Sequence, residues 1–191
     1  MIYFYSDPHF FHENIIRLAD RPFSSEEEMN HSLVNSYNAV VDCSDEVYFL
    51  GDLAFNRKKI KNGLLDAKKV NNILKKLNGR KYLIEGNHDD WFLKDPQFSR
   101  SLFQWIKKRH VLEYNGRSIV LVHDPAPYLP DPETGAPPAE KLNENEILIY
   151  GHVHGDFVHD IPQPSKCVCV EQTDYRPVSL DEVLAGLGLQ I

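Results

Sequence analysis

The stretch Lys81-Tyr82-Leu83-Ile84-Glu85-Gly86-Asn87-His88-Asp89 joins an apolar run to a polar turn. The apolar half predicts a short buried strand, which ends at the glycine. Asn87 and His88 then follow the carboxyl end of that strand, at the rim where open α/β sheets place their ligands. Taken alone, such a turn is more often an ordinary polar loop than a site. Its meaning therefore depends on whether the arrangement occurs again.

The same arrangement, an apolar run that ends in Asp or His, does occur again along the chain. The polar positions concerned are Asp7 and His9, Asp52, His123, and His152 with His154. Each piece alone is weak, since Asp-x-His, Gly-Asp and His-x-His are all common without function. Repetition at successive strand ends makes chance a poor explanation for the set.

Strands and helices are mixed along the chain, according to the spacing of its apolar residues. We expect strands at 2–6, 46–52, 81–85, 111–114, 118–122, 147–150 and 166–171, and helices at 14–20, 29–41, 67–77 and 179–187. A capping box at 24–28 precedes the second helix, and Asn115-Gly116 marks the turn of an antiparallel hairpin. The predicted class is α/β, with a mixed sheet or two packed sheets flanked by helices.

The length and charge of the chain limit the classes of function. The 191 residues are most simply one domain with a sizeable core. No apolar run approaches the roughly 20 residues that span a bilayer, and no basic-then-apolar leader precedes the first strand, so we expect a cytoplasmic protein. The net charge of −7 disfavours strong binding to nucleic acid. Bound cations would neutralise part of that charge, so a phosphorylated substrate remains compatible with it.

Three cysteines, Cys43, Cys167 and Cys169, are too few for a disulfide framework. Cys167 and Cys169 stand two apart in an alternating run, which would place both on one face of a strand. Neither has partners at zinc-site spacing. We therefore interpret all three as small core or half-buried residues.

Five of the nine histidines stand at strand ends beside Asp or Asn. Neutral imidazole is a common ligand of divalent transition metals, and carboxylates complete such sites. Asp7 and His9 are two apart, so an extended backbone would place both on one face, and His152 and His154 have the same spacing. Without thiolates nearby, Mn, Fe, Ni or a catalytic Zn is favoured over a structural zinc site. The two oxygens of Asp52 would let it bridge two ions.

This ordered set resembles the signature of the calcineurin-like metallophosphoesterase superfamily. It comprises Asp7-x-His9, Gly51-Asp52, Gly86-Asn87-His88-Asp89, His123 and Gly151-His152-Val153-His154. The opening 3–10 with His12, Asn14 and Ile15, and the closing 170–178, resemble a small bacterial and phage branch, with Phe11 where a glycine is expected. The resemblance implies a single calcineurin-like phosphoesterase domain over 1–191. Its fold would be a β-sandwich of two mixed sheets flanked by α-helices, with the active site at the strand ends.

The resemblance also implies a role for each motif residue. One metal would take Asp7, His9, Asp52 and His154, and the other would take Asp52, Asn87, His123 and His152. His88 would be the catalytic residue that assists the leaving oxygen without binding metal. Asp89 is a candidate for orienting His88. His12, Asn14 and Arg57 are candidate substrate contacts, although each such residue is more often a capping or solvated one.

The implied cofactors are two divalent metal ions, with Mn²⁺ favoured and Fe, Ni, Co or Zn as alternatives. Two such ions lower the pKa of a bridging water and supply hydroxide for in-line attack on phosphorus. We expect a two-metal phosphodiesterase acting on nucleotides or other small diesters, with no membrane partner and no extended nucleic-acid binding. The alternatives are a phosphomonoesterase, a nuclease, and a catalytically silent binding protein. The last is ranked lowest because His88 and all seven ligand positions are present.

Overall fold

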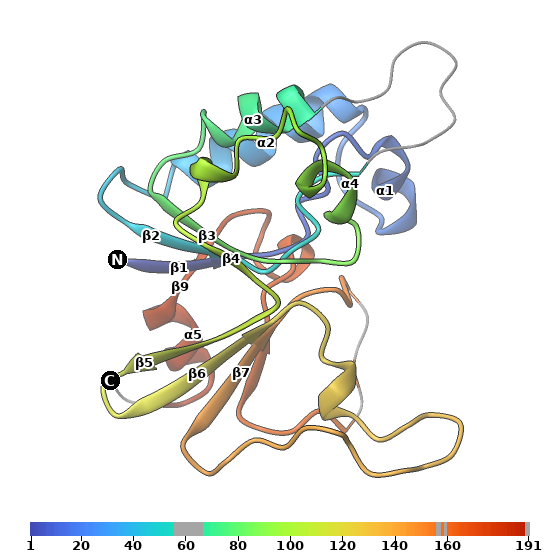
Figure 1. Cartoon of the computed structure of the whole chain (residues 1–191), viewed down its shortest axis with the longest axis vertical. Coiled ribbons are helices and arrows are strands. Elements are labelled where there is room, and N and C mark those ends of the chain that lie inside the picture. The colour runs from blue at the N-terminus through green and yellow to red at the C-terminus, as the bar shows by residue number, and fades with distance from the viewer. Residues whose placement is uncertain (56–66, 156–157, 159, 190–191) are drawn as a thin grey trace.

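Two β-sheets pack against each other in the computed structural model, which describes residues 1–55, 67–155, 158 and 160–189 (Figure 1). In that part of the chain, the first sheet has the order β4-β3-β2-β1-β9 and the second has the order β5-β6-β7-β8. Their bounds are β1 Ile2–Tyr5, β2 Glu46–Phe49, β3 Arg80–Ile84, β4 Ile106–Lys107, β5 Arg109–Tyr114, β6 Arg117–Val122, β7 Glu146–Tyr150, β8 Ser165–Cys167 and β9 Val178–Ser179.

Both sheets are mixed. Strands β1 to β4 run parallel and β9 runs antiparallel beside β1. In the second sheet β5 and β6 form the expected antiparallel hairpin, whereas β6, β7 and β8 run parallel. The predicted α/β class, with two mixed sheets flanked by helices, is therefore confirmed.

The strands of the first sheet are apolar on both faces because both faces are covered. Phe4, Tyr48 and Ile84 belong to the apolar cluster that also contains Ile119 and Ile149 of the second sheet. Tyr3, Tyr5, Val47, Phe49 and Leu83 alternate with them and join a cluster on the opposite face, together with residues of the covering helices such as Leu33 and Leu74. The continuous apolar runs of the sequence follow directly from this double burial.

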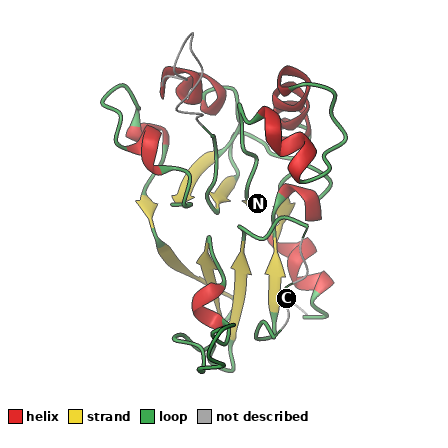
Figure 2. Cartoon of the chain, turned by 90° about the vertical axis from the view of Figure 1, so that its right-hand side faces the viewer, coloured by secondary structure: helices red, strands yellow, loops and turns green. Residues whose placement is uncertain are grey.

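Helices α1 (Glu13–Leu18), α2 (Glu26–Asn38), α3 (Ala67–Leu74) and α4 (Asp90–Leu93) lie on the outer side of the first sheet (Figures 1 and 2). Helix α5 (Leu180–Gly186) instead contributes Leu180, Val183 and Leu184 to the apolar cluster between the sheets. The short 3₁₀ turns η1 (Arg100–Leu102), η2 (Ala126–Tyr128) and η3 (Val170–Gln172) complete the described elements. None of the helices in the described ranges is long and apolar enough to cross a membrane.

The prediction of one strand over 166–171 was wrong in its second half. Strand β8 ends at Cys167, and Val170–Gln172 form η3. The reason is a change of partner: Val168 N donates to Tyr150 O of the second sheet, whereas Val170 N donates to Ser6 O beyond β1. The chain crosses from one sheet to the other here, so Cys169 lies beyond the end of β8, although its thiol still interacts with that of Cys167.

The three cysteines accordingly have three environments. Cys169 is buried and Cys167 is half-buried, as expected. Cys43 is exposed, contrary to expectation. It lies in the turn between α2 and β2, whose Asp45 carboxylate accepts a hydrogen bond from Asp42 N, so its side chain projects outside the core.

Candidate metal centre

The carboxyl ends of the parallel strands meet at one edge of the molecule, and the motif residues follow them there. Asp7 and His9 follow β1, Asp52 follows β2, Asn87 and His88 follow β3, His123 follows β6, and His152 and His154 follow β7. Backbone hydrogen bonds align the turns within each sheet, from Asp7 N to Gly51 O (3.1 Å) and from Gly151 N to His123 O (2.9 Å). The predicted convergence of these motifs is therefore present.

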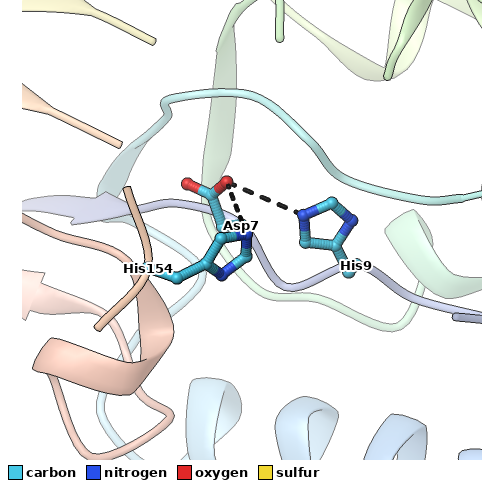
Figure 3. A group of neighbouring side chains, drawn as sticks. All are labelled: Asp7, His9 and His154. Atoms are coloured by element: carbon cyan, nitrogen blue, oxygen red, sulfur yellow. Dashed lines mark ion pairs between the residues drawn. The ribbon is translucent and has the colours of Figure 1, made fainter. Parts of the chain in front are cut away.

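The converging side chains form two groups of metal-ligand type, each with its ligand atoms within 4.8 Å of one another. Asp7, His9 and His154 make up the first group (Figure 3). Asp7 Oδ1 lies 3.7 Å from His9 Nε2 and 3.8 Å from His154 Nε2. Asp52, His123 and His152 make up the second group.

Asp52 lies between the two groups. Its Oδ2 is 3.5 Å from His9 Nε2 of the first group, and its Oδ1 is 3.6 Å from His123 Nε2 of the second. Burial raises the pKa of Asp52 more than nearby His123 lowers it, and the Asp7 carboxylate adds to the increase. Two buried carboxylates close together carry negative charge that a bound cation would offset.

Unpaired buried atoms in the first group point to such a cation. Among the described residues, Asp7 Oδ1 and both ring nitrogens of His9 are buried without a hydrogen-bond partner. Buried polar atoms are rarely left in that state, because each costs free energy. Asp7 Oδ2 by contrast accepts hydrogen bonds from Ser6 Oγ, His152 N and Cys169 Sγ. Oδ1 therefore remains available to a metal ion.

Lone pairs converge in the second group in the same way. His123 Nδ1 lies 2.7 Å from Leu50 O, and because a carbonyl only accepts, Nδ1 carries the hydrogen. His123 Nε2 therefore presents a lone pair, 2.8 Å from Asn87 Oδ1 and 3.2 Å from His152 Nδ1. A bound cation would interact favourably with all of these acceptor atoms. The residues of both groups thus fit divalent metal ions.

The surroundings shift the pKa values of the two histidines of the first group in opposite directions. Burial, together with the charges of His154 and Arg21, lowers the pKa of His9 well below its ordinary value, which keeps its imidazole neutral. Burial opposes the charged form of His154, but the hydrogen bond to Glu171 and the charge of Asp7 outweigh it and raise the pKa. A basic imidazole held by a carboxylate is a usual arrangement around metal ligands.

The backbone at these positions adopts a conformation that few non-glycine residues take. Asp7, His9, Asp52, His152 and His154 all have φ between 48° and 72°. Such strain persists only where the surrounding structure over-determines it, and it concentrates at functional sites. Phe11 has φ +66°, which explains why a glycine is the expected residue there.

Asp89 has a different role from the one considered for it. Its carboxylate accepts hydrogen bonds from the backbone nitrogens of Asp52, Leu53 and Gly86, at 2.8 to 3.0 Å. Burial and the nearby charge of Asp52 raise its pKa to about 7. Asp89 therefore ties the turn after β2 to the turn after β3, and these bonds are directed at the backbone rather than at the His88 ring.

His88 lies at the rim of the centre, with 41% of its side chain exposed and Nε2 4.0 Å from Asp52 Oδ2. His12 is buried nearby, its ring 5.4 Å from that of His9 and stacked at 3.9 Å on Phe55. Phe55 also touches His88 edge-on, with ring centroids 5.0 Å apart, a contact the sequence did not indicate. Asn14 lies half-buried in α1, and Arg57 lies outside the described residues.

A pocket of about 480 Å³ opens beside the second group. Asn87, His123 and His152 line it, as does the buried Tyr128. Its remaining lining is mainly charged: the cations are Lys108 and Arg109, and the carboxylates are Glu85, Asp90, Asp124 and Glu140. An ester bound at the centre therefore has room for an attached group on this side.

Two residues with buried side chains support the first group, and the sequence did not indicate either as functional. Arg21 and Glu171 form an ion pair, with Arg21 Nη2 2.7 Å from Glu171 Oε1, and Glu171 Oε1 lies 3.0 Å from His154 Nδ1. Burial alone would raise the pKa of Glu171, but the hydrogen bond from His154 and the charge of Arg21 lower it. Glu171 lies in the closing motif 170–178, whereas no local pattern distinguishes Arg21 from a surface arginine.

Comparisons with known proteins agree with this site. A family model described as the calcineurin-like phosphoesterase superfamily domain matches residues 2–170. The uncharacterized protein MJ1445 of Methanocaldococcus jannaschii is 37% identical over 188 residues, which are 96% of this chain and 89% of that protein.

Among solved structures, the protein of unknown function AQ665 from Aquifex aeolicus matches with a TM-score of 0.65 and 31% identity, over 96% of this chain and 97% of that one. The E. coli phosphoesterase Yfce matches with a TM-score of only 0.32 and 19% identity, over 79% of this chain and 68% of that one. This likeness is too weak to indicate the function of this chain. The match to the family model, by contrast, covers nearly the whole chain, and the chain belongs to the calcineurin-like phosphoesterase superfamily, a family of metal-dependent phosphoester hydrolases.

Proposed function

We propose that this protein is a two-metal phosphodiesterase that acts on nucleotides or other small diesters. The observation that carries the proposal is the position of Asp52, whose two oxygens lie 3.5 Å and 3.6 Å from histidines of different groups. One ion would be held by Asp7, His9, Asp52 and His154, and the other by Asp52, Asn87, His123 and His152. Two bound divalent cations supply a hydroxide nucleophile near neutral pH and offset the charge of the phosphoryl group.

The protein's own groups have separate tasks in this proposal. Asp52 would be a ligand of both ions, and the hydrogen bond from His88 N to Asp52 Oδ1 (2.9 Å) fixes the orientation of its carboxylate. The exposed His88 ring stands where it can reach an ester oxygen, to which it would donate a hydrogen bond or proton as the bond to phosphorus breaks. The pocket beside the second group would receive one of the two alcohol groups of a diester.

The charge of that pocket favours a diester over a monoester. Its lining carboxylates outnumber its cations, four to two (Glu85, Asp90, Asp124 and Glu140 against Lys108 and Arg109). A phosphate monoester has a second pKa of about 6 and is largely a dianion at pH 7, whereas a diester carries a single charge. The monoester is therefore repelled more strongly. The whole-chain charge of −7 acts in the same direction against long polyanions such as nucleic acid.

Hydrolysis of bis-p-nitrophenyl phosphate and of p-nitrophenyl phosphate, with Mn²⁺ added to chelator-stripped protein, tests this function. We expect the diester to be the better substrate, and its turnover to be lost in Asp52→Ala. His88→Ala should retain metal and lose roughly 10² or more in kcat. Preferential monoester turnover would make the protein a phosphatase, and metal binding without turnover of either ester would contradict the proposal.

A pair of variants tests the charge argument separately. The pocket variant combines Glu140→Gln with Asp124→Asn and so removes two of the four lining carboxylates. It should raise kcat/KM for the monoester relative to the diester. Glu133→Gln, in the same loop region but outside the pocket lining, is the matched control and should leave the ratio unchanged. An unchanged ratio in the pocket variant would show that pocket charge does not set the preference.

A further inference from the structure

Arg21 is a fully buried cation with an unusual set of partners. Its side chain has 0% exposure. Nη1 donates to Pro8 O and Nη2 donates to Asp7 O, both at 2.8 Å, while Nε and Nη2 donate to Glu171 Oε1 at 2.9 Å and 2.7 Å. Burying an ion pair costs desolvation energy that the attraction between the charges seldom exceeds by much. Its presence therefore calls for an explanation beyond stability.

The carbonyls that Arg21 contacts belong to the strained turn that carries two members of the first group. Asp7 has φ +58° and His9 has φ +48°, and Pro8 lies between them. A guanidinium that binds the carbonyls of both Asp7 and Pro8 holds this turn in its left-handed conformation. The planar fork of arginine can reach two carbonyls and a carboxylate at once, which a lysine ammonium on its flexible stem does less well.

Glu171 extends the same anchor to the third member of the first group. Its side chain is 7% exposed, and its Oε1 accepts hydrogen bonds from Arg21 and from His154 Nδ1. In the neutral imidazole of His154, donation from Nδ1 to Glu171 leaves the lone pair on Nε2, which lies 3.8 Å from Asp7 Oδ1. The ion pair thus fixes both the tautomer and the orientation of this imidazole.

The second group has separate supports. His123 is fixed by Leu50 O through Nδ1. Asp52 is fixed by the backbone of His88 and, through the turn that carries it, by Asp89. The two groups meet at Asp52 and at the hydrogen bond from His152 N to Asp7 Oδ2, but the side-chain hydrogen bonds of Arg21 and Glu171 go to the first group and its turn.

From this geometry we infer that Arg21 and Glu171 are positioning residues for the first metal site, and that they set its affinity far more than that of the second. The inference rests on the proposed metal sites. Loss of such supporting contacts generally weakens metal affinity by roughly 10- to 100-fold. Weakening one site and sparing the other would convert a two-metal centre into a one-metal centre at intermediate metal concentrations.

The test is a Mn²⁺ titration of the chelator-stripped full chain, followed by calorimetry and by electron paramagnetic resonance. Wild type should bind two ions and give a spin-coupled pair. In Glu171→Gln, which keeps the shape of the side chain, we expect one dissociation constant to rise roughly 10- to 100-fold while the other stays within about threefold. The signal of an isolated ion should then appear at intermediate metal. Arg21→Lys, which keeps the charge, should have the same selective effect.

The control is Glu182→Gln, which removes an Arg–Glu pair (Arg176 and Glu182) elsewhere on the molecule. It should bind both ions as wild type does. Circular dichroism of each metal-free variant establishes that it is folded, and Glu171→Gln and Arg21→Lys serve as independent routes should one fail to fold. Unchanged affinities in a folded variant, or an equal loss at both sites, would overturn the inference. Selective loss in a protein whose wild type hydrolyses neither ester would support the inference while the proposed function fails.

Discussion

At Gly151 the backbone passes so close to Asp7 that there is no space for a side chain. A Cβ built at this position would lie 2.0 Å from Ser6 Oγ and 2.5 Å from Asp7 Oδ2. Gly151→Ala should therefore displace Asp7, cost about 1–3 kcal/mol of unfolding free energy, and weaken Mn²⁺ binding. Urea unfolding of the metal-free protein and a Mn²⁺ titration measure the two effects. Gly155→Ala is the control, because nothing lies within 4 Å of its built Cβ, and equal behaviour of the two variants would refute the steric argument.

A second prediction concerns the single residue Asp89. Its two oxygens accept from three backbone N–H groups, and an asparagine would present one oxygen and an NH₂ group to those donors. Asp89→Asn should therefore cost about 1–3 kcal/mol, the range for buried donors left unpaired. Asp90→Asn removes a neighbouring carboxylate that is 69% exposed, and should cost far less. Comparable losses in the two variants, measured by urea unfolding, would contradict this role for Asp89.

Among the elements, α5 has the most clearly defined start. Ser179 Oγ accepts from Glu182 N, and Glu182 Oε2 accepts from Ser179 N, which forms a capping box. The hydrogen bond from Arg176, followed by those from Ser179, lowers the pKa of Glu182 to about 2. Since the folded pKa lies below the unfolded value of about 4.3, this stabilisation is present above pH 4.3 and is lost as the pH falls toward 2.

Glu182→Gln should therefore reduce stability at pH 7 and make the acid decline between about pH 4.3 and 2 less steep. The effect should be modest, because Glu182 is 44% exposed and solvent screens its charge. Urea unfolding at a series of pH values measures it. Asp181→Asn makes the same charge change in the same helical turn but leaves the capping box intact, and serves as the control. Parallel profiles for wild type and Glu182→Gln would show that the capping carboxylate does not contribute.

The sequence predicted those elements whose formation depends on neighbouring residues, and it missed features that depend on contacts between distant parts of the chain. The strands carrying Asp7, Asp52 and His123 were predicted within a few residues, because burial on both faces gives continuous apolar runs. The crossing at 168–170 was missed because it depends on which sheet offers the next partner. Arg21 was missed for the same reason. Its partners Asp7, Pro8 and Glu171 are distant in sequence, so the residues around Arg21 do not indicate these contacts.

For the molecule as a whole, the candidate metal centre is also a junction between the two sheets. Asp7, Asp52 and Asn87 follow strands of the first sheet, whereas His123, His152 and His154 follow strands of the second. The first group therefore joins Asp7 and His9 of one sheet to His154 of the other, and the second joins Asp52 to His123 and His152. Ions bound by these groups would connect the sheets at the strand ends, beyond the apolar cluster between them.

Metal removal should therefore destabilise the whole fold and not only the site. A ligand that binds the folded chain alone adds RT ln(1 + [L]/Kd) to its stability, about 2.7 kcal/mol when Mn²⁺ is present at 100 times its Kd. Thermal unfolding in chelator and in Mn²⁺ should show a higher Tm with metal, rising with its concentration. Asp52→Asn, which weakens the ligand shared by both ions, should lose most of this increase, and Gly155→Ala should keep it. A Tm that does not respond to Mn²⁺ in wild type would mean that these side chains do not hold metal between the sheets.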